Sequence, residues 1–260
     1  MVTTACGGDE ASSAPDGDPG RVVLTVTSEG GFMPVEFHLD RMPRYLVTAD
    51  RTLYYTGPIP MIYPGPLLPN IQVGTVDEAT WSEIMTIIDD IGFSGFDERI
   101  DTDGAEMIAD ASTEFVTYYD DAGAHRYGAY ALGLTSGPSS TDRVLLENMI
   151  QLLDQESVRG DSHAYVGEHL QVAAGLSMME PEPGFSSVEP WPLDVSFDDM
   201  GEWLIGWRCT TVEGAEAADL FELFGSANHA TLWDTGADQV SIKARPLLPG
   251  EEPCSDPMST

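Results

Sequence analysis

Two pairs of strand-like runs stand so close together along the chain that each pair is expected to form an antiparallel hairpin. Three residues separate residues 45–48 from residues 52–55, and a short turn rich in Asp and Gly separates residues 114–119 from residues 125–132. β-Branched and aromatic residues, which favour strands, fill the runs, whereas Asp and Gly favour turns. Because short connections of this kind join neighbouring antiparallel strands, the sheet that contains them is predicted to be antiparallel.

Three other segments carry the 3.6-residue apolar spacing of amphipathic helices. The first follows Asp77, whose side chain favours the N-cap position, and the second follows Thr141, which we expect to cap it in the same way. The third covers residues 215–224. The apolar stripes are Trp81, Ile84, Met85, Ile88 and Ile91 in the first helix, Leu145, Met149, Leu152 and Leu153 in the second, and Ala218, Leu220, Phe221 and Phe224 in the third.

Further strands are expected at residues 21–27, 163–173, 203–211 and 239–244. Strands and helices that alternate with hairpins indicate an α+β fold. We expect antiparallel sheets with about three packed helices, arranged in one or two subdomains. The expected parts are a disordered lipoprotein tether at 1–20, an N-terminal α+β subdomain at 21–160, a C-terminal α+β subdomain at 161–254 and a tail at 255–260.

Two proline-rich segments interrupt this pattern. Residues 57–70 contain five prolines, and they are expected to run extended over the surface because each proline fixes its own φ and cannot donate a hydrogen bond. Residues 176–200 contain four prolines and several acidic residues. We interpret this second segment as an interdomain or capping loop.

The charge of the chain is strongly one-sided. Lys and Arg number 11 and Asp and Glu number 44, which gives a formal net charge of −33, and Lys243 is the only lysine. Such a surface repels nucleic acids and anionic lipid headgroups, so no nucleic-acid partner is expected. The acidic residues are spread through the chain, which is typical of a protein adapted to high salt, where repulsion is screened. A sink for calcium or other cations is the alternative interpretation.

Cys6 stands in a context that suggests a bacterial lipidation site. Thr4 and Ala5 are small residues directly before it, and residues 7–20 are dominated by Gly, Ser, Pro and Asp. That composition favours a flexible polar spacer. A secretory signal needs an apolar region of roughly 7–15 residues, and only five residues precede Cys6 here. The expectation is a lipid anchor on Cys6, which requires that the start of the chain is placed too late or that the signal has been trimmed. The alternative is an ordinary thiol in a disordered tail.

The chain contains two other cysteines, Cys209 and Cys254. If Cys6 carries lipid, these two form an even pair, and outside the cytoplasm such a pair usually closes into a disulfide. A bridge between them would hold the C-terminus against the body of the protein. Two unrelated thiols, buried or free, are the alternative.

Several segments resemble those of uncharacterised actinobacterial lipoproteins. They are residues 63–69, residues 129–133, residues 212–217 after Cys209, and residues 245–251 followed by Cys254. The resemblance implies a lipid-anchored protein on the outer face of the cytoplasmic membrane, in the cell envelope, with a Cys209–Cys254 bridge. It implies no activity.

Few residues suggest chemistry. His163 and His169 would share one face of a single strand, but the sequence lacks the His-Glu-x-x-His and Cys-x-x-Cys motifs of metal sites, and no metal or other cofactor is expected. Residues 101–104 with Asp110 resemble part of a calcium loop, except that Arg99 occupies the first ligand position of that motif. We expect an acidic surface loop there, and no catalytic residue is assigned.

The aromatic residues around the first proline-rich segment are the remaining candidates. Tyr54, Tyr55 and Tyr63 could line a groove for a glycan, a peptide or an envelope protein, or they could pack beneath the loop as core. The sequence therefore favours a non-enzymatic binding or interaction module of the bacterial envelope. The alternative is an extracytoplasmic hydrolase with a non-standard site.

Overall fold

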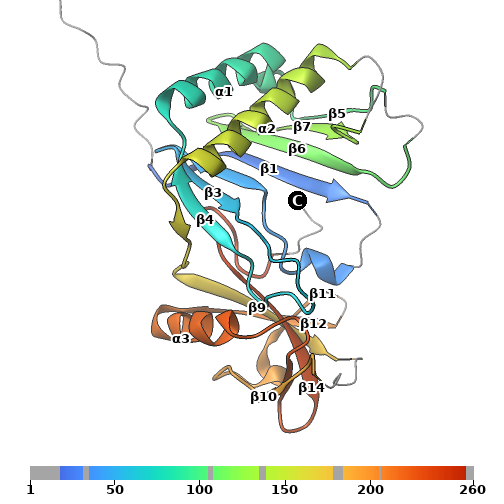
Figure 1. Ribbon diagram of the computed structural model, residues 1–260, viewed down its shortest axis with the longest axis vertical. Coiled ribbons are helices and arrows are strands. Elements are labelled where there is room, and N and C mark those ends of the chain that lie inside the picture. Colours follow the sequence, from blue (N-terminus) through green and yellow to red (C-terminus); the bar gives the residue numbers. More distant parts are fainter. Residues whose placement is uncertain are drawn as a thin grey trace, which may run out of the picture.

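The chain folds into a mixed α+β structure, shown as a computed structural model in Figure 1. The structure describes residues 18–31, 35–104, 108–134, 139–177, 184–204 and 206–255. Cys6 and the expected tether up to residue 17 lie outside the described residues. Within them, three α-helices accompany one sheet of eight strands and another of six. The helices are α1 (Glu78–Ile91), α2 (Thr141–Arg159) and α3 (Gly214–Gly225).

The first sheet has the strand order β5-β7-β6-β1-β2-β3-β4-β8. Its strands are β1 (Val22–Gly30), β2 (Tyr45–Thr48), β3 (Thr52–Thr56), β4 (Ile71–Thr75), β5 (Glu98–Asp101), β6 (Ser112–Asp120), β7 (Gly123–Tyr130) and β8 (His163–Ala164). The predicted hairpins β2–β3 and β6–β7 are both present. Every neighbouring pair is antiparallel except β5 and β7, which run parallel.

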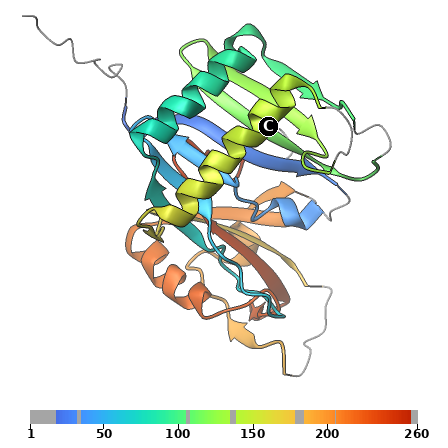
Figure 2. The same ribbon diagram turned by 45° about the horizontal axis from the view of Figure 1, so that its top comes forward.

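Helices α1 and α2 lie side by side across one face of this sheet (Figures 1 and 2). Helix α1 begins as predicted, because the Asp77 carboxylate accepts a hydrogen bond from the Thr80 amide at 2.9 Å. Ile84 and Ile88 of α1 and Leu146 and Met149 of α2 are buried against the sheet in one large core. Both helices bury an apolar stripe against the same face of the first sheet, so they cover only one of its two faces.

The second sheet has the order β10-β13-β14-β9-β12-β11. Its strands are β9 (His169–Leu176), β10 (Val188–Pro190), β11 (Gly201–Leu204), β12 (Trp207–Glu213), β13 (Leu232–Asp234) and β14 (Gln239–Pro246). Helix α3 covers it and buries Leu220 and Phe224. The Phe224 ring meets the buried indole of Trp233 edge-on at 5.4 Å. The two sheets therefore have separate cores.

Four expectations are wrong in detail. Residues 163–173 form two strands, β8 and β9, in different sheets, so the chain crosses between the sheets where one strand was predicted. Residues 203–211 form the β11–β12 hairpin instead of one strand. Ser140, one residue before Thr141, caps α2, because its hydroxyl accepts the Arg143 amide at 3.1 Å. Part of 176–200, expected as a loop, is β10, which pairs with β13 in parallel.

Two segments cross from one half of the molecule to the other. Leu67, from the proline-rich segment that joins β3 to β4, is buried in the core of the second sheet. In the opposite direction, the segment after β14 returns to the first sheet, where Leu248 packs with Leu46 and Ile71 on the face opposite to the helices. Residues 247–255 are called the C-terminal strap below.

Gly128 on β7 is a position where the fold demands glycine. A Cβ atom there would fall against Cε1 of Phe115 and within 2.8 Å of its Cδ1. The ring has little freedom to move, since the Arg126 guanidinium lies 3.6 Å from its centroid. We expect Gly128→Ala to lower the free energy of unfolding by about 1–3 kcal/mol through overpacking, measured by urea denaturation.

Gly95→Ala is the matched control, because a Cβ at Gly95 meets nothing within 4 Å. Its effect should stay within about 0.5 kcal/mol. Equal effects of the two substitutions would show that the Phe115 ring does not constrain residue 128.

Candidate binding surface

The first half of the first proline-rich segment carries a cluster of apolar side chains that face solvent. Met61 is fully exposed and Tyr63 is 73 % exposed, and Ile59 and Ile62 are each more than half exposed. Phe185, from a distant part of the chain, places its ring 5.8 Å from that of Tyr63. These five residues are called the apolar crest. Exposed apolar clusters of this kind mark interaction surfaces more often than isolated exposed residues do.

Hydrogen bonds join the two ends of the loop that carries the crest. The Gly57 amide donates to the Asn70 carbonyl at 2.7 Å, and the Asn70 side-chain amide donates to the Pro58 carbonyl at 2.9 Å. Gln72 donates in turn to the Asn70 side chain at 2.6 Å. A Cβ at Gly57 would come within 2.8 Å of Asn70 and Gln72, so glycine allows this close approach. The two limbs of the loop are therefore joined where the crest begins.

The returning limb is also pinned to the second half of the molecule. The Leu67 amide donates to the Ala227 carbonyl at 3.1 Å, and the His229 amide donates to the Gly65 carbonyl at 3.0 Å. Pro66 forms an isolated bridge with Asn228. Since both limbs are held and prolines limit the backbone between them, the crest presents its apolar side chains from a restrained loop.

The three tyrosines proposed as a groove do not lie on one surface. Tyr55 faces the helices, is 7 % exposed and donates its hydroxyl to the Ser157 carbonyl of α2 at 2.9 Å. Tyr54 faces the opposite side, where its ring meets Tyr165 edge-on at 5.2 Å, because successive residues of a strand alternate in direction. Only Tyr63 belongs to the crest. Its ring partner Phe185 carried no sequence signal that linked it to this loop.

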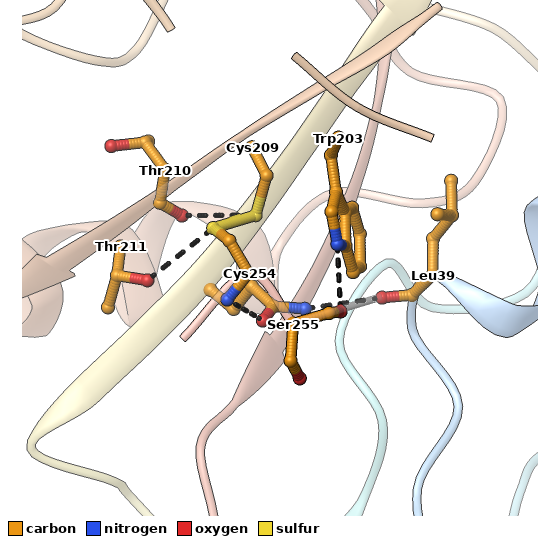
Figure 3. Close-up of a disulfide and its surroundings, with 8 residues drawn as sticks. Leu39, Trp203, Cys209, Thr210, Thr211, Cys254 and Ser255 are labelled. Carbon is orange, nitrogen blue, oxygen red and sulfur yellow. Dashed lines mark hydrogen bonds between the residues drawn. A yellow bond between two sulfur atoms is a disulfide. The ribbon is translucent and has the colours of Figure 1, made fainter. Parts of the chain in front are cut away.

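A disulfide joins Cys209 of β12 to Cys254 of the C-terminal strap, with Cα atoms 5.8 Å apart (Figure 3). The Cys254 amide donates to the buried side chain of Gln171 at 2.9 Å, and the Trp203 indole donates to the Ser255 carbonyl at 2.8 Å. The pairing predicted from the cysteine count is confirmed. The disulfide fastens the strap, which itself covers part of the first sheet.

Two hollows lie near the helices. One, of about 120 Å³, is lined by Leu132, Gly133, Ser139, Arg143 and Glu147. The other, of about 510 Å³, is a groove between α1 and α2. Among the described residues, neither hollow is lined by a histidine or a cysteine.

The residues that suggested metal chemistry are separated or already bonded. His163 and His169 lie on β8 and β9 in different sheets. The carboxylate of Asp101 accepts hydrogen bonds from the hydroxyls of Ser140 at 2.5 Å and Tyr127 at 2.9 Å. Burial and this bond to Asp101 raise the pKa of Tyr127 to about 12. Within the described ranges, no group of three His, Cys, Asp or Glu side chains could hold a metal ion.

His125 is a buried histidine whose two nitrogens both face acceptors. Nδ1 lies 2.8 Å from the Phe96 carbonyl and Nε2 lies 3.1 Å from the Asp120 carboxylate. The Phe96 carbonyl, and then Asp120, raise the pKa of His125 above its ordinary 6.5. Hydrogen bonds from the Ala122 amide and His125 lower the pKa of Asp120.

These shifts predict a window of pH in which the pair stabilises the fold. A raised histidine pKa stabilises the native state fully below pH 6.5, and the contribution is lost as pH rises through the folded-state pKa. A lowered Asp120 pKa contributes above its ordinary 3.8 and is lost as pH falls through the lowered value. As pH rises from about 6 to about 8, the urea midpoint of the wild type should therefore decrease relative to that of His125→Gln. Parallel profiles would contradict this assignment.

No helix in the described part of the chain is long and apolar enough to cross a membrane. No protein-family model, curated protein or solved structure matches the chain.

Proposed function

We propose that this protein is a non-enzymatic binding module of the bacterial envelope, held at the outer face of the cytoplasmic membrane by a lipid on Cys6. The apolar crest carries this proposal, because it exposes large apolar side chains from a loop clasped at its base. Restraint before binding lowers the ordering cost of forming a complex. The Cys209–Cys254 disulfide supports an oxidising location, in line with the resemblance to actinobacterial lipoproteins.

The position of the crest relative to the expected tether favours a protein partner over the membrane itself. The chain enters the fold beside the turn between β2 and β3, where Ala49 and Asp50 donate to the carbonyls of Arg21 and Pro19. The crest follows the other end of β3, a strand of five residues that spans about 17 Å. The crest and the point where the expected tether joins the fold therefore lie at opposite ends of β3. The hydrolase alternative draws no support from the two hollows.

The crest is tested by photo-crosslinking in the native host. A benzophenone amino acid replaces Met61, and a second protein carries it at Val158, an equally free position at 84 % exposure on α2. We expect a discrete crosslinked product from position 61 that is missing from position 158. Identical products, or none from position 61, would contradict a partner at the crest.

Competition sharpens this test. Added wild-type protein should suppress the crosslink, and Met61→Ser/Ile62→Ser should do so roughly tenfold less well, because two apolar side chains no longer become buried. Val144→Ser/Val158→Ser, which removes two exposed apolar side chains from α2, should compete like the wild type.

The anchor is tested separately by intact-mass analysis of the native membrane fraction, with and without reductant. We expect a mature chain that begins at a diacylglyceryl-modified Cys6, with Cys209 and Cys254 joined. An unmodified chain that begins at Met1 with free thiols at both positions would overturn the envelope location and leave the crest result to stand alone.

A further inference from the structure

The groove between α1 and α2 is a second surface that the proposed function does not use. Its volume is about 510 Å³, and each helix contributes one continuous face to it. Its lining runs from Glu83 to Asp90 on α1 and from Leu145 to Gln155 on α2. These stretches span seven and ten residue steps, which correspond to about 10 Å and about 15 Å of helix. The groove thus matches two to three turns of another helix.

The floor and the rim of the groove differ in chemistry. Ile87 is buried at 6 % exposure, and Leu145 and Leu152 are partly buried against the core below. Glu83 and Asp90 are exposed on the α1 rim, and neither forms an ion pair with a described residue. On the α2 rim the polar groups are the amides of Asn148, Gln151 and Gln155. An apolar floor is therefore bordered by unpaired negative charge on one side and neutral amides on the other.

The sequence of α1 strengthens this asymmetry. Residues Glu78–Ile91 contain no Lys or Arg, so no cation on that helix neutralises the rim. The lining residues include no basic side chain on either helix. An acidic or phosphorylated partner would meet repulsion here, whereas a partner with cations beside an apolar stripe would meet complementary charge.

We propose that this groove is the docking site for a basic amphipathic helix of a partner protein. The apolar stripe of that helix would pack on Ile87, Leu145 and Leu152, and its Lys or Arg residues would lie against Glu83 and Asp90. This is the helix-in-groove mode of recognition, in which residues spaced i, i+3, i+4 and i+7 fill an apolar groove. The inference does not depend on the apolar crest, which is uncharged and belongs to a different part of the fold.

The test uses two designed peptides of about 14 residues, which span about 21 Å as helices. Both carry Leu at the same i, i+3, i+4 and i+7 positions, and the remaining positions are Lys-rich in one and Glu-rich in the other. Fluorescence anisotropy of the labelled peptides measures their affinity for the full-length protein. We expect the Leu/Lys peptide to bind and to weaken as salt is raised, and the Leu/Glu peptide not to bind.

Matched charge variants separate the groove from the general negative charge of the protein. Glu83→Gln/Asp90→Asn removes the two rim charges, and Glu202→Gln/Asp238→Asn removes two exposed charges from the second half of the molecule. The groove variant should raise the Kd of the Leu/Lys peptide roughly tenfold, the effect of two exposed ion pairs. The control variant should leave it nearly unchanged. All four positions are exposed, and circular dichroism checks that both proteins fold.

Hydrogen exchange supplies an independent measurement on the wild-type protein. The bound Leu/Lys peptide should slow exchange in α1 and α2 and leave α3 unchanged. Equal loss of affinity in the two charge variants, protection outside α1 and α2, or no binding of the Leu/Lys peptide would each overturn the proposal.

Discussion

Loss of the Cys209–Cys254 disulfide is expected to lower the free energy of unfolding by about 4 kcal/mol, because the bridge closes a loop of 45 residues and so restricts the unfolded chain. The native contacts reinforce this expectation. Gln171, which bonds the Cys254 amide, also donates to the Leu39 carbonyl at 3.5 Å. The bridge thus holds the C-terminal strap where both halves of the molecule meet (Figure 3).

The measurement is urea denaturation of Cys209→Ser/Cys254→Ser against the wild type. Cys6→Ser is the control, since it removes a cysteine outside the bridge and should leave the urea midpoint unchanged. The single variants would expose a free thiol and are less informative. A loss below about 1 kcal/mol would contradict the entropic account of this bridge.

Arg143→Ala is expected to destabilise the protein by about 3–5 kcal/mol, the usual cost of removing one member of a buried polar network. Its side chain is 1 % exposed at the start of α2. The guanidinium donates to the Tyr130 carbonyl at 2.6 Å and to the Asp101 carbonyl at 3.2 Å. Without it, both carbonyls lose a donor in a site from which water is largely excluded, and the Asp101 carboxylate, 4.0 Å from the guanidinium, loses its cationic neighbour.

Arg159→Ala in the same helix is the matched control. Arg159 is exposed at the last turn of α2 and forms no ion pair with a described residue, so its loss should cost less than about 0.5 kcal/mol. Thermal or urea unfolding of both variants measures the difference. Similar stabilities of the two variants would contradict the buried network around Arg143.

Local signals in the sequence predicted the elements whose causes are local. The β2–β3 and β6–β7 hairpins follow from turn residues between β-rich runs, and α1 follows from the Asp77 cap and the stripe behind it. The boundary between β8 and β9 was not predicted, because its cause is not local. No proline interrupts residues 163–173, and only the position of the second sheet makes the chain leave the first one there.

In the candidate surfaces, too, some features have local causes and others arise only in the folded chain. Five prolines predicted that residues 57–70 would not form regular structure, but the alternation along β3 separates Tyr54 from Tyr55, and Phe185 reaches Tyr63 only in the folded chain. The stripe in α2 predicted that Leu145 and Leu152 pack on the core. They are partly buried against it, and in the folded chain they also line the groove beside α1.

The sequence by itself determined the α+β class, the excess of negative charge and a pair of cysteines able to bridge. These properties depend on composition and on spacing between near neighbours. The tertiary structure alone decided that Arg143, at a helix start where charge is usually exposed, is buried, because its partners come from β5 and β7. It also decided that the apolar crest faces solvent: Leu67 of the returning limb is buried in the second core beside Ala227, and the Asn70 bond to Pro58 joins the two limbs where the crest begins.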